Sequence, residues 1–116
     1  MILIGMQNAI DASRTIVGPG DIAVQTEQTL MNVQACLEAA GARREHLIQW
    51  TIYLAQGQSL QAAFEVGQRW WANRPNPPAN SVILVPALVP SEFLIGIEAI
   101  AVVPSLSDEP RKADLL

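Results

Sequence analysis

A single glutamate stands in the middle of an otherwise apolar segment near the end of the chain. In the run 95–100, the neighbours of Glu98 on its own side of an extended strand are Gly96 and Ile100. A carboxyl group in apolar surroundings is suited to proton transfer at neutral pH. The alternative is a structural carboxylate, either at a wet strand end or paired with an arginine across a subunit boundary. Spacing alone leaves both interpretations open.

The other residue types that could do chemistry are isolated. Cys36 is the only cysteine, which excludes an intramolecular disulfide and a cysteine-based zinc site. No base adjoins it in the sequence, so we expect it in or near the core rather than as a nucleophile. His46 is the only histidine and has no ligand cluster around it, so we expect it at the surface and predict no metal site.

Two adjacent pairs of large side chains have competing interpretations. Arg43 and Arg44 could contact a nucleic acid, but without stacking aromatics around them they are more typical of a solvated turn. Trp70 and Trp71 cannot share one helix face, so at least one is partly exposed. They either pack under the proline-rich loop that follows them or contact a ligand or a neighbouring subunit.

Length and composition indicate one globular domain. The chain has 116 residues, of which 50% are hydrophobic and 16% charged, and no apolar run approaches the ~20 residues needed to cross a bilayer. We expect a single domain over residues 1–103, a flexible tail over 104–116, and a reducing cytoplasm as the location. The formal net charge of -4 repels phosphate on average and disfavours nucleic-acid binding.

Hydrophobic periodicity predicts two helices. Apolar residues recur every three or four positions between Asp21, a good N-cap, and Gly41, a good C-terminal stop. A second helical pattern begins after Ser59 and stops before the proline-rich loop 74–78. Its predicted apolar stripe consists of Leu60, Ala63, Phe64, Gly67 and Trp71.

Four segments have the character of strands, which gives the order β-α-β-α-β-β. The first segment begins at Ile2 and the second covers 46–55. The last two cover 81–85 and 93–103, and we expect them to form a hairpin. In 46–55, Ile48, Trp50, Ile52 and Leu54 alternate with the more polar Gln49, Thr51 and Tyr53. The predicted fold is α/β (α+β), a mixed sheet with both helices on one face. The last two strands are apolar on both sides, so the uncovered sheet face predicts a homo-oligomer.

Several segments together resemble the reactive-intermediate deaminase family, also called the Rid, YjgF-like or L-PSP-like family. They follow the family's order over most of residues 1–103, and the resemblance depends on the whole set rather than on one short motif. The segments are Val17-Gly18-Pro19-Gly20-Asp21-Ile22, Gln25-Thr26, Leu30, Asn32, Leu37-Glu38-Ala39-Ala40-Gly41, Thr51-Ile52-Tyr53-Leu54, Pro78-Ala79 and Ile97-Glu98-Ala99-Ile100-Ala101.

The resemblance implies a chorismate-mutase-like fold that assembles as a homotrimer with clefts between subunits. It also implies hydrolysis of imines or enamines, without metal or organic cofactor. The resemblance assigns Glu98 to positioning or activating water. It places Asn80 where the family has an arginine that holds the substrate carboxylate, and Phe64 where it has an asparagine on the second helix.

We therefore expect a cofactor-free hydrolytic deaminase of a reactive imine or enamine, with Glu98 as the catalytic residue and Asn80 and Phe64 binding substrate. An asparagine amide cannot supply the charge-assisted, bidentate clamp of a guanidinium. The alternative is therefore a catalytically weak ligand-binding or regulatory Rid-like trimer. A minor alternative is an endoribonuclease-like RNA binder. The sequence does not reveal the substrate.

Overall fold

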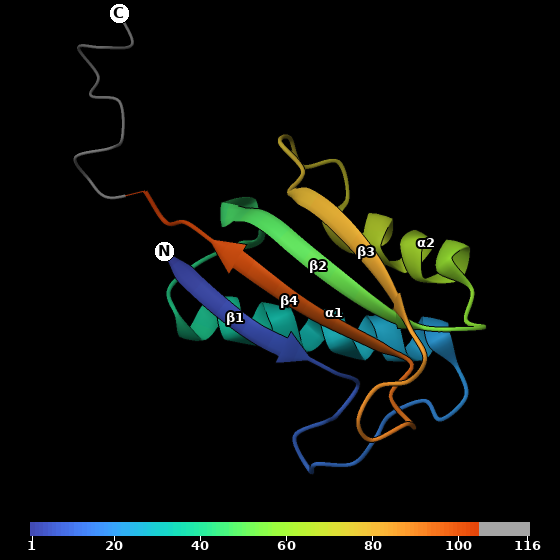
Figure 1. Cartoon of the computed structure of the whole chain (residues 1–116). Helices are drawn as coiled ribbons and strands as arrows, with labels where there is room; N and C mark the ends of the chain where they lie inside the picture. Colours follow the sequence, from blue (N-terminus) through green and yellow to red (C-terminus); the bar gives the residue numbers. More distant parts are fainter. Residues whose placement is uncertain (105–116) are drawn as a thin grey trace, which may run out of the picture.

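The computed structural model describes residues 1–104, and this part of the chain forms one mixed sheet with two helices on the same face (Figure 1). This arrangement confirms the predicted α+β class. The proposed tail lies, apart from Pro104, outside the described residues. In chain order the elements are β1 (Ile2–Gln7), α1 (Ile22–Ala39), the 3₁₀ turn η1 (Arg44–His46), β2 (Leu47–Ala55), α2 (Leu60–Trp71), β3 (Ala79–Val85) and β4 (Ile95–Ala101).

The prediction that the last two strands form a hairpin is wrong. The sheet order is β1-β4-β2-β3, in which β3 pairs in parallel with β2 and β4 pairs antiparallel with both β1 and β2. Burial explains why β4 does not pair with β3. β4 is buried at most positions on both faces and suits the centre of the sheet, whereas β3 is mostly exposed and forms an edge. β2, α2 and β3 thus form the usual helical crossover between parallel strands.

Both helices begin at the predicted caps. The Asp21 carboxylate accepts a hydrogen bond from the backbone N–H of Val24 at 3.1 Å, and the Ser59 hydroxyl accepts one from Ala62 at 3.1 Å. α1 stops before Gly41, whose φ of +74° suits a residue without a Cβ. The core lies between α1, α2 and the sheet and includes Leu30, Val33, Leu37, Leu54, Ile95 and Ile97.

β2 follows the predicted alternation except near its start. Trp50 and Leu54 face the helices as expected, but Ile48, predicted to share their face, is 51% exposed. Between Leu47 and Gln49 the register with β4 shifts, because two steps along β2 match one step along β4. This bulge turns Ile48 outward.

The apolar stripe of α2 is only partly buried. Ala63 and Trp71 are buried as predicted, and Val66 joins them, but Leu60 and Phe64 are 44% and 47% exposed. The two exposed side chains border a cavity instead of contributing to a close-packed core. The cavity therefore explains why the stripe and the burial pattern differ.

Two amide side chains of α1 hold distant loops. Gln25 is fully buried; its NH₂ donates to the carbonyl of Glu92 at 2.9 Å and its oxygen accepts from the N–H of Leu94 at 2.7 Å. The NH₂ of Asn32 donates to the carbonyl of Asn8 at 2.8 Å. These contacts replace water for part-buried backbone groups; those of Gln25 fix the chain just before β4, and that of Asn32 fixes the chain just after β1.

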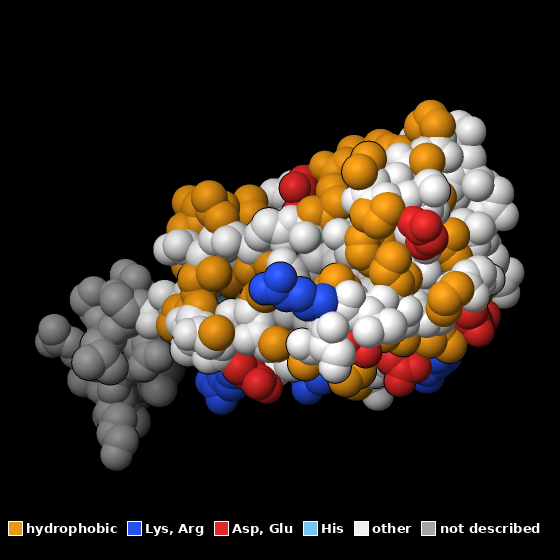
Figure 2. Space-filling view, turned by 90° about the horizontal axis from the view of Figure 1, so that it is seen from below, with side chains coloured by type: hydrophobic (Ala, Val, Ile, Leu, Met, Phe, Trp, Pro, Cys, Tyr) orange, Lys and Arg blue, Asp and Glu red, His pale blue; other side chains and the backbone are white. Residues whose placement is uncertain are grey.

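The sheet face away from the helices is not covered by either helix. Leu3 on β1 is 73% exposed, and Ile83, which pairs with Tyr53 and so shares its face, is 43% exposed. Figure 2 shows hydrophobic side chains gathered along the upper edge of the view and most charged side chains along the lower edge. The homo-oligomer predicted from this open face stays a prediction.

Within residues 1–104, neither helix combines the length and apolar character needed to span a membrane.

Candidate active site

Glu98 lies on the open face of the sheet, near the middle of β4. It is half-buried and pairs across the sheet with Thr51 of β2. One carboxylate oxygen, Oε1, accepts a hydrogen bond from the hydroxyl of Tyr53 at 2.7 Å. A shallow groove of about 320 Å³ surrounds the carboxylate, and its walls are formed by Leu3, Ile4, Gly5, Gln49, Thr51, Ala99 and Ile100. We call this region the Glu98 groove.

Tyr53 was not among the predicted site residues. The hydrogen bond to the Glu98 carboxylate raises the pKa of the Tyr53 hydroxyl, and partial desolvation is a smaller cause in the same direction. Tyr53 therefore remains a neutral donor at physiological pH and holds one oxygen of Glu98 in place. Strand alternation put Tyr53 on the wetter face of β2, and that pattern was the one available signal for its role.

Asn80 and Phe64 both line a larger cavity on the opposite, helix-covered side of the sheet. This helix-side cavity has a volume of about 640 Å³ and lies between α2, the edge strand β3 and the loop that joins them. Asn80 faces it because it pairs in parallel register with Trp50, whose side chain faces the helices. The other lining residues are Thr26, Leu30, Trp50, Ile52, Leu60, Ala63, Gly67, Gln68, Trp71, Ala72, Asn73, Pro77, Pro78, Ile95 and Ile97.

The structure brings Asn80 and Phe64 together but separates them from Glu98. Adjacent residues of a strand point to opposite faces, and β2 shows this directly, because Trp50 pairs with Asn80 whereas Thr51 pairs with Glu98. Within one chain the sheet therefore stands between the carboxylate and the cavity. A small ligand cannot touch Glu98 and Asn80 of the same chain at once.

The helix-side cavity is apolar, aromatic and uncharged. Trp50, Phe64 and Trp71 provide large flat surfaces, and no Asp, Glu, Lys or Arg from residues 1–104 lines it. Its polar side chains are a hydroxyl and three amides: Thr26, Gln68, Asn73 and Asn80. In the described part of the chain, Trp50 Nε1 is the buried side-chain polar atom left without a hydrogen-bond partner.

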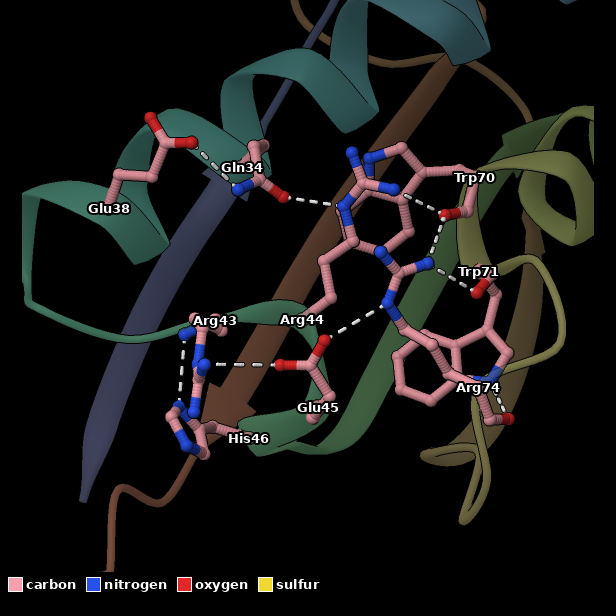
Figure 3. A network of polar contacts seen from close by, with 9 residues as sticks. All are labelled: Gln34, Glu38, Arg43, Arg44, Glu45, His46, Trp70, Trp71 and Arg74. Atoms are coloured by element: carbon pink, nitrogen blue, oxygen red, sulfur yellow. Dashed lines mark hydrogen bonds and ion pairs between the residues drawn. The ribbon is translucent and has the colours of Figure 1, made fainter.

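Figure 3 shows the contacts that support the end of α2 beside the cavity. The Arg44 guanidinium lies 4.5 Å from the centroid of the Trp70 ring, and it donates to Gln34 Oε1 and to the Trp70 carbonyl, each at 2.6 Å. Arg74 donates to the Trp71 carbonyl at 2.7 Å and pairs with Glu45 at 3.1 Å. The arginines thus bind the free carbonyls at the C-terminus of the helix.

The prediction of a solvated turn is therefore wrong for Arg44. Partial burial, together with the nearby charge of Arg74, lowers the pKa of the Arg44 guanidinium. Arg43 alone matches the prediction, with a side chain that is 78% exposed. Arg44 and Arg74 each direct two guanidinium nitrogens to groups of the same chain, so a phosphate would compete with these contacts.

Trp70 and Trp71 pack within the chain, which agrees with the first of the two interpretations. Trp71 is 8% exposed, and its Nε1 donates to the carbonyl of Arg74 at 2.9 Å, while Trp70 is half-buried beneath Arg44. Both rings contact Trp50, with centroids 5.9 and 6.4 Å apart. Trp71 also lines the helix-side cavity, so its packing role and a ligand-contact role are compatible.

The isolated cysteine and histidine have structural surroundings. Cys36 is half-buried at the edge of the core. His46 is half-buried in η1, where its Nδ1 accepts a hydrogen bond from the backbone N–H of Arg43 at 2.9 Å. Within residues 1–104, no three side chains of the types that ligate metals come together.

The fold and the two regions can now be compared with known proteins. Residues 1–103 match the family model described as Endoribonuclease L-PSP. The chain belongs to this family, which is the YjgF/Rid family. The resemblance seen in the sequence is thereby confirmed.

Relatives in this family are about one third identical to the chain over the aligned residues. A RutC family protein of Pyrococcus horikoshii is 36% identical over 100 residues, which are 86% of this chain and 77% of that protein. The 2-iminobutanoate/2-iminopropanoate deaminase of Escherichia coli is 34% identical over 87 residues, which are 72% of this chain and 66% of that protein. The crystal structure of a Rid family protein from Yersinia pestis superposes with a TM-score of 0.78 at 32% identity, covering 88% of this chain and 77% of the other.

Proposed function

We propose that the protein is a cofactor-free hydrolase that converts a reactive imine or enamine into a carbonyl compound and ammonia. It acts in the cytoplasm as a homotrimer, in a cleft between two subunits. In the reaction, the oxygen of a water molecule bonds to the imine carbon while the C=N π electrons move to nitrogen. Nitrogen gains the proton that the water loses, which gives a carbinolamine. The hydroxyl proton of the carbinolamine then also passes to nitrogen, the C–N bond breaks, and ammonia leaves as the carbonyl forms. The overall balance is R₂C=NH + H₂O → R₂C=O + NH₃.

The observation that carries this proposal is the hydrogen-bonded pair of Tyr53 and Glu98. A half-buried carboxylate with one oxygen held at 2.7 Å by a tyrosine has its second oxygen free to accept a proton from water. Glu98 takes the proton as the water attacks and returns it to the departing nitrogen. Tyr53 acts as a positioning residue, because it fixes the direction of the carboxylate.

The opposite placement of Glu98 and Asn80 supports a site shared by two chains. If the open face of one subunit packs near the mouth of a neighbour's helix-side cavity, Glu98 of the first chain can face Asn80 and Phe64 of the second. The exposed apolar residues of the open face, such as Leu3 and Ile83, favour such contact. A heterologous contact of this kind closes into a three-membered ring when it rotates one subunit by a third of a turn relative to the next.

The similarity to the Escherichia coli deaminase adds chemical support. That relative is named as a deaminase of 2-iminobutanoate and 2-iminopropanoate, and 72% of this chain aligns with it. We transfer to this chain the reaction class, not the two substrates.

Mixing two inactive variants tests the shared site. Glu98→Gln removes the proton acceptor, and Asn80→Trp fills the mouth of the cavity at an exposed position of an edge strand. Each homo-oligomer is expected to be inactive. After co-refolding at equal amounts, random assembly makes about a quarter of the sites from two unaltered halves, so about a quarter of the wild-type rate returns.

The readout is semicarbazone formation from an imine generated in situ, which slows when the enzyme hydrolyses the imine first. Glu98→Gln mixed with the double variant Glu98→Gln/Asn80→Trp is the matched control, since no site in that mixture regains the carboxylate. If the first mixture also stays inactive, the cleft between subunits is not the site.

A second candidate function is a Rid-like trimer that binds a ligand without turning it over. The uncharged helix-side cavity favours it, because no described residue there supplies a cation to hold a carboxylate. Equal rates for the wild type and Glu98→Gln on every imine tested, together with measurable ligand binding, would favour this second function.

A further inference from the structure

The lining of the helix-side cavity defines what it can hold. A volume of about 640 Å³ is within the range of pockets that bind small molecules. Aromatic side chains stand on several sides of it: Trp50 from β2, and Phe64 and Trp71 from α2. Such flat apolar surfaces favour a ligand that itself carries an aromatic or bulky apolar group.

The cavity offers no compensation for a ligand carboxylate. None of its lining side chains within residues 1–104 is charged, and Arg44 and Arg74, at the end of α2, already donate to the carbonyls of Trp70 and Trp71. A carboxylate that leaves water for such surroundings loses hydration without gaining a charged partner. The cavity therefore selects against anions.

The polar groups of the cavity suit a neutral ligand. The Asn80 side chain makes no hydrogen bond to residues 1–104 and provides one acceptor and two donors. An imine N–H can donate a hydrogen bond to the amide oxygen, and an imine or carbonyl acceptor can accept a hydrogen bond from the amide NH₂. Trp50, which lines the cavity and is only 9% exposed, has an indole Nε1 without a hydrogen-bond partner in residues 1–104, and a ligand acceptor can supply that partner.

We propose that the substrate of this protein is an uncharged imine with an aromatic or bulky apolar group, rather than an imino acid. This inference rests on the proposed function and specifies its substrate class. The apolar group occupies the space between Trp50, Phe64 and Trp71, and the C=N group lies at the mouth beside Asn80. There the Glu98 carboxylate of a neighbouring chain can reach the attacking water.

A matched pair of substrates tests the proposal. The imine of phenylacetaldehyde, made in situ from 2-phenylethylamine by a flavin amine oxidase, differs from 2-imino-3-phenylpropanoate, made from phenylalanine by an amino-acid oxidase, by the carboxylate alone. With the semicarbazone readout, we expect kcat/KM to favour the neutral imine by about tenfold or more. Equal rates, or a preference for the imino acid, would overturn the proposal.

Variants of Asn80 locate the preference in the cavity. Asn80→Arg introduces the missing cation and is expected to reverse the preference toward the imino acid. Asn80→Gln keeps an uncharged amide and is the matched control, which should still favour the neutral imine. If Asn80→Arg leaves the preference for the neutral imine unchanged, the cavity does not determine whether the protein accepts a substrate with a carboxylate.

A binding measurement separates this inference from the hydrolase itself. If neither imine is hydrolysed, the proposed function fails, and tryptophan fluorescence can still compare phenylacetamide with phenylacetate, because Trp50 and Trp71 line the cavity. Tighter binding of the amide by about tenfold supports an uncharged ligand class. Equal binding, no binding of either probe, or tighter binding of phenylacetate overturns it. Loss of amide binding in Phe64→Asn, with Met31→Asn on the outer surface of α1 as control, assigns the signal to the cavity.

Discussion

The helix-side cavity and the Glu98 groove occupy opposite faces of the same sheet and differ in every property that matters for catalysis. The cavity is large, aromatic and without charge within the described residues, while the groove is half its volume and contains a carboxylate held by Tyr53. One region can enclose an apolar ligand, and the other can move a proton. Neither holds both capacities.

This division explains why a chain of this size would need a second copy to act. A sheet four strands wide has two faces, and two helices cover only one of them. The covered face can form a cavity, whereas the open face can carry a polar group such as Glu98 at modest cost because it is not sealed from water. Bringing the two together requires one chain's open face to meet another chain's cavity.

The largest expected effect is that of removing the carboxylate from the groove. Glu98→Gln should lower turnover by about a hundredfold or more, because the isosteric amide cannot accept a proton from water. The unfolding temperature should change little. Glu27→Gln, at an exposed position of α1, is the matched control and should retain full activity. An unchanged rate for Glu98→Gln would remove the groove from the mechanism.

The second prediction concerns the contact between the two regions. Wild-type protein should be a trimer by light scattering at micromolar concentration. Ile83→Lys places a charge on the open face and should dissociate it, since burying an unpaired ammonium costs several kcal/mol. Met31→Lys makes the same change at an exposed apolar position of α1 and should leave the assembly intact. A monodisperse wild-type monomer would contradict the shared site.

Tyr53 allows the electrostatics of the groove to be measured directly. It is the only tyrosine of the chain, so the absorbance of tyrosinate reports this side chain alone. Because the Tyr53 hydroxyl donates a hydrogen bond to the Glu98 carboxylate, the pKa of Tyr53 is raised, and the titration midpoint should lie above the usual value of about 10. In Glu98→Gln the midpoint should move back down, and failure to move would show that the pair is not formed in solution.

The raised pKa of Tyr53 also predicts how the free energy of unfolding depends on pH. A raised pKa in the folded state means that folding favours the protonated phenol. This contribution to the free energy of unfolding is fully present below the unfolded pKa of about 10 and is lost as the pH rises through the folded pKa. Tyr53→Phe should abolish this alkaline loss and, by freeing the Glu98 carboxylate, lower turnover by about tenfold.

The smallest expected effect concerns the support of the cavity wall. Arg44→Lys retains the charge but cannot stack flat on Trp70 and also bind Gln34 and the Trp70 carbonyl, so it should lower the free energy of unfolding by about 1 kcal/mol. Arg43→Lys, at a side chain that is 78% exposed, is the control and should have little effect. Denaturant titration measures both; equal midpoints would mean that the network contributes nothing.

Local patterns in the sequence determined much of the fold. The N-caps Asp21 and Ser59 and the extent of both helices depend on residues close in the chain and agree with the structure. The apolar stripe of α2 and the alternation of β2 agree only in part. The isolation of Glu98 among apolar residues was equally visible. These features are local because hydrogen bonds and side-chain spacing within one element do not depend on its neighbours.

Only the tertiary structure decided which strands are neighbours and therefore which side chains meet. Alternation assigned Tyr53 to one side of β2, but its contact with Glu98 depends on β4 lying beside β2 instead of pairing with β3. The separation of Asn80 from Glu98 depends on that same register. Strand pairing joins segments far apart in the chain, and it is selected by burial of the whole sheet, which no local pattern of residues encodes.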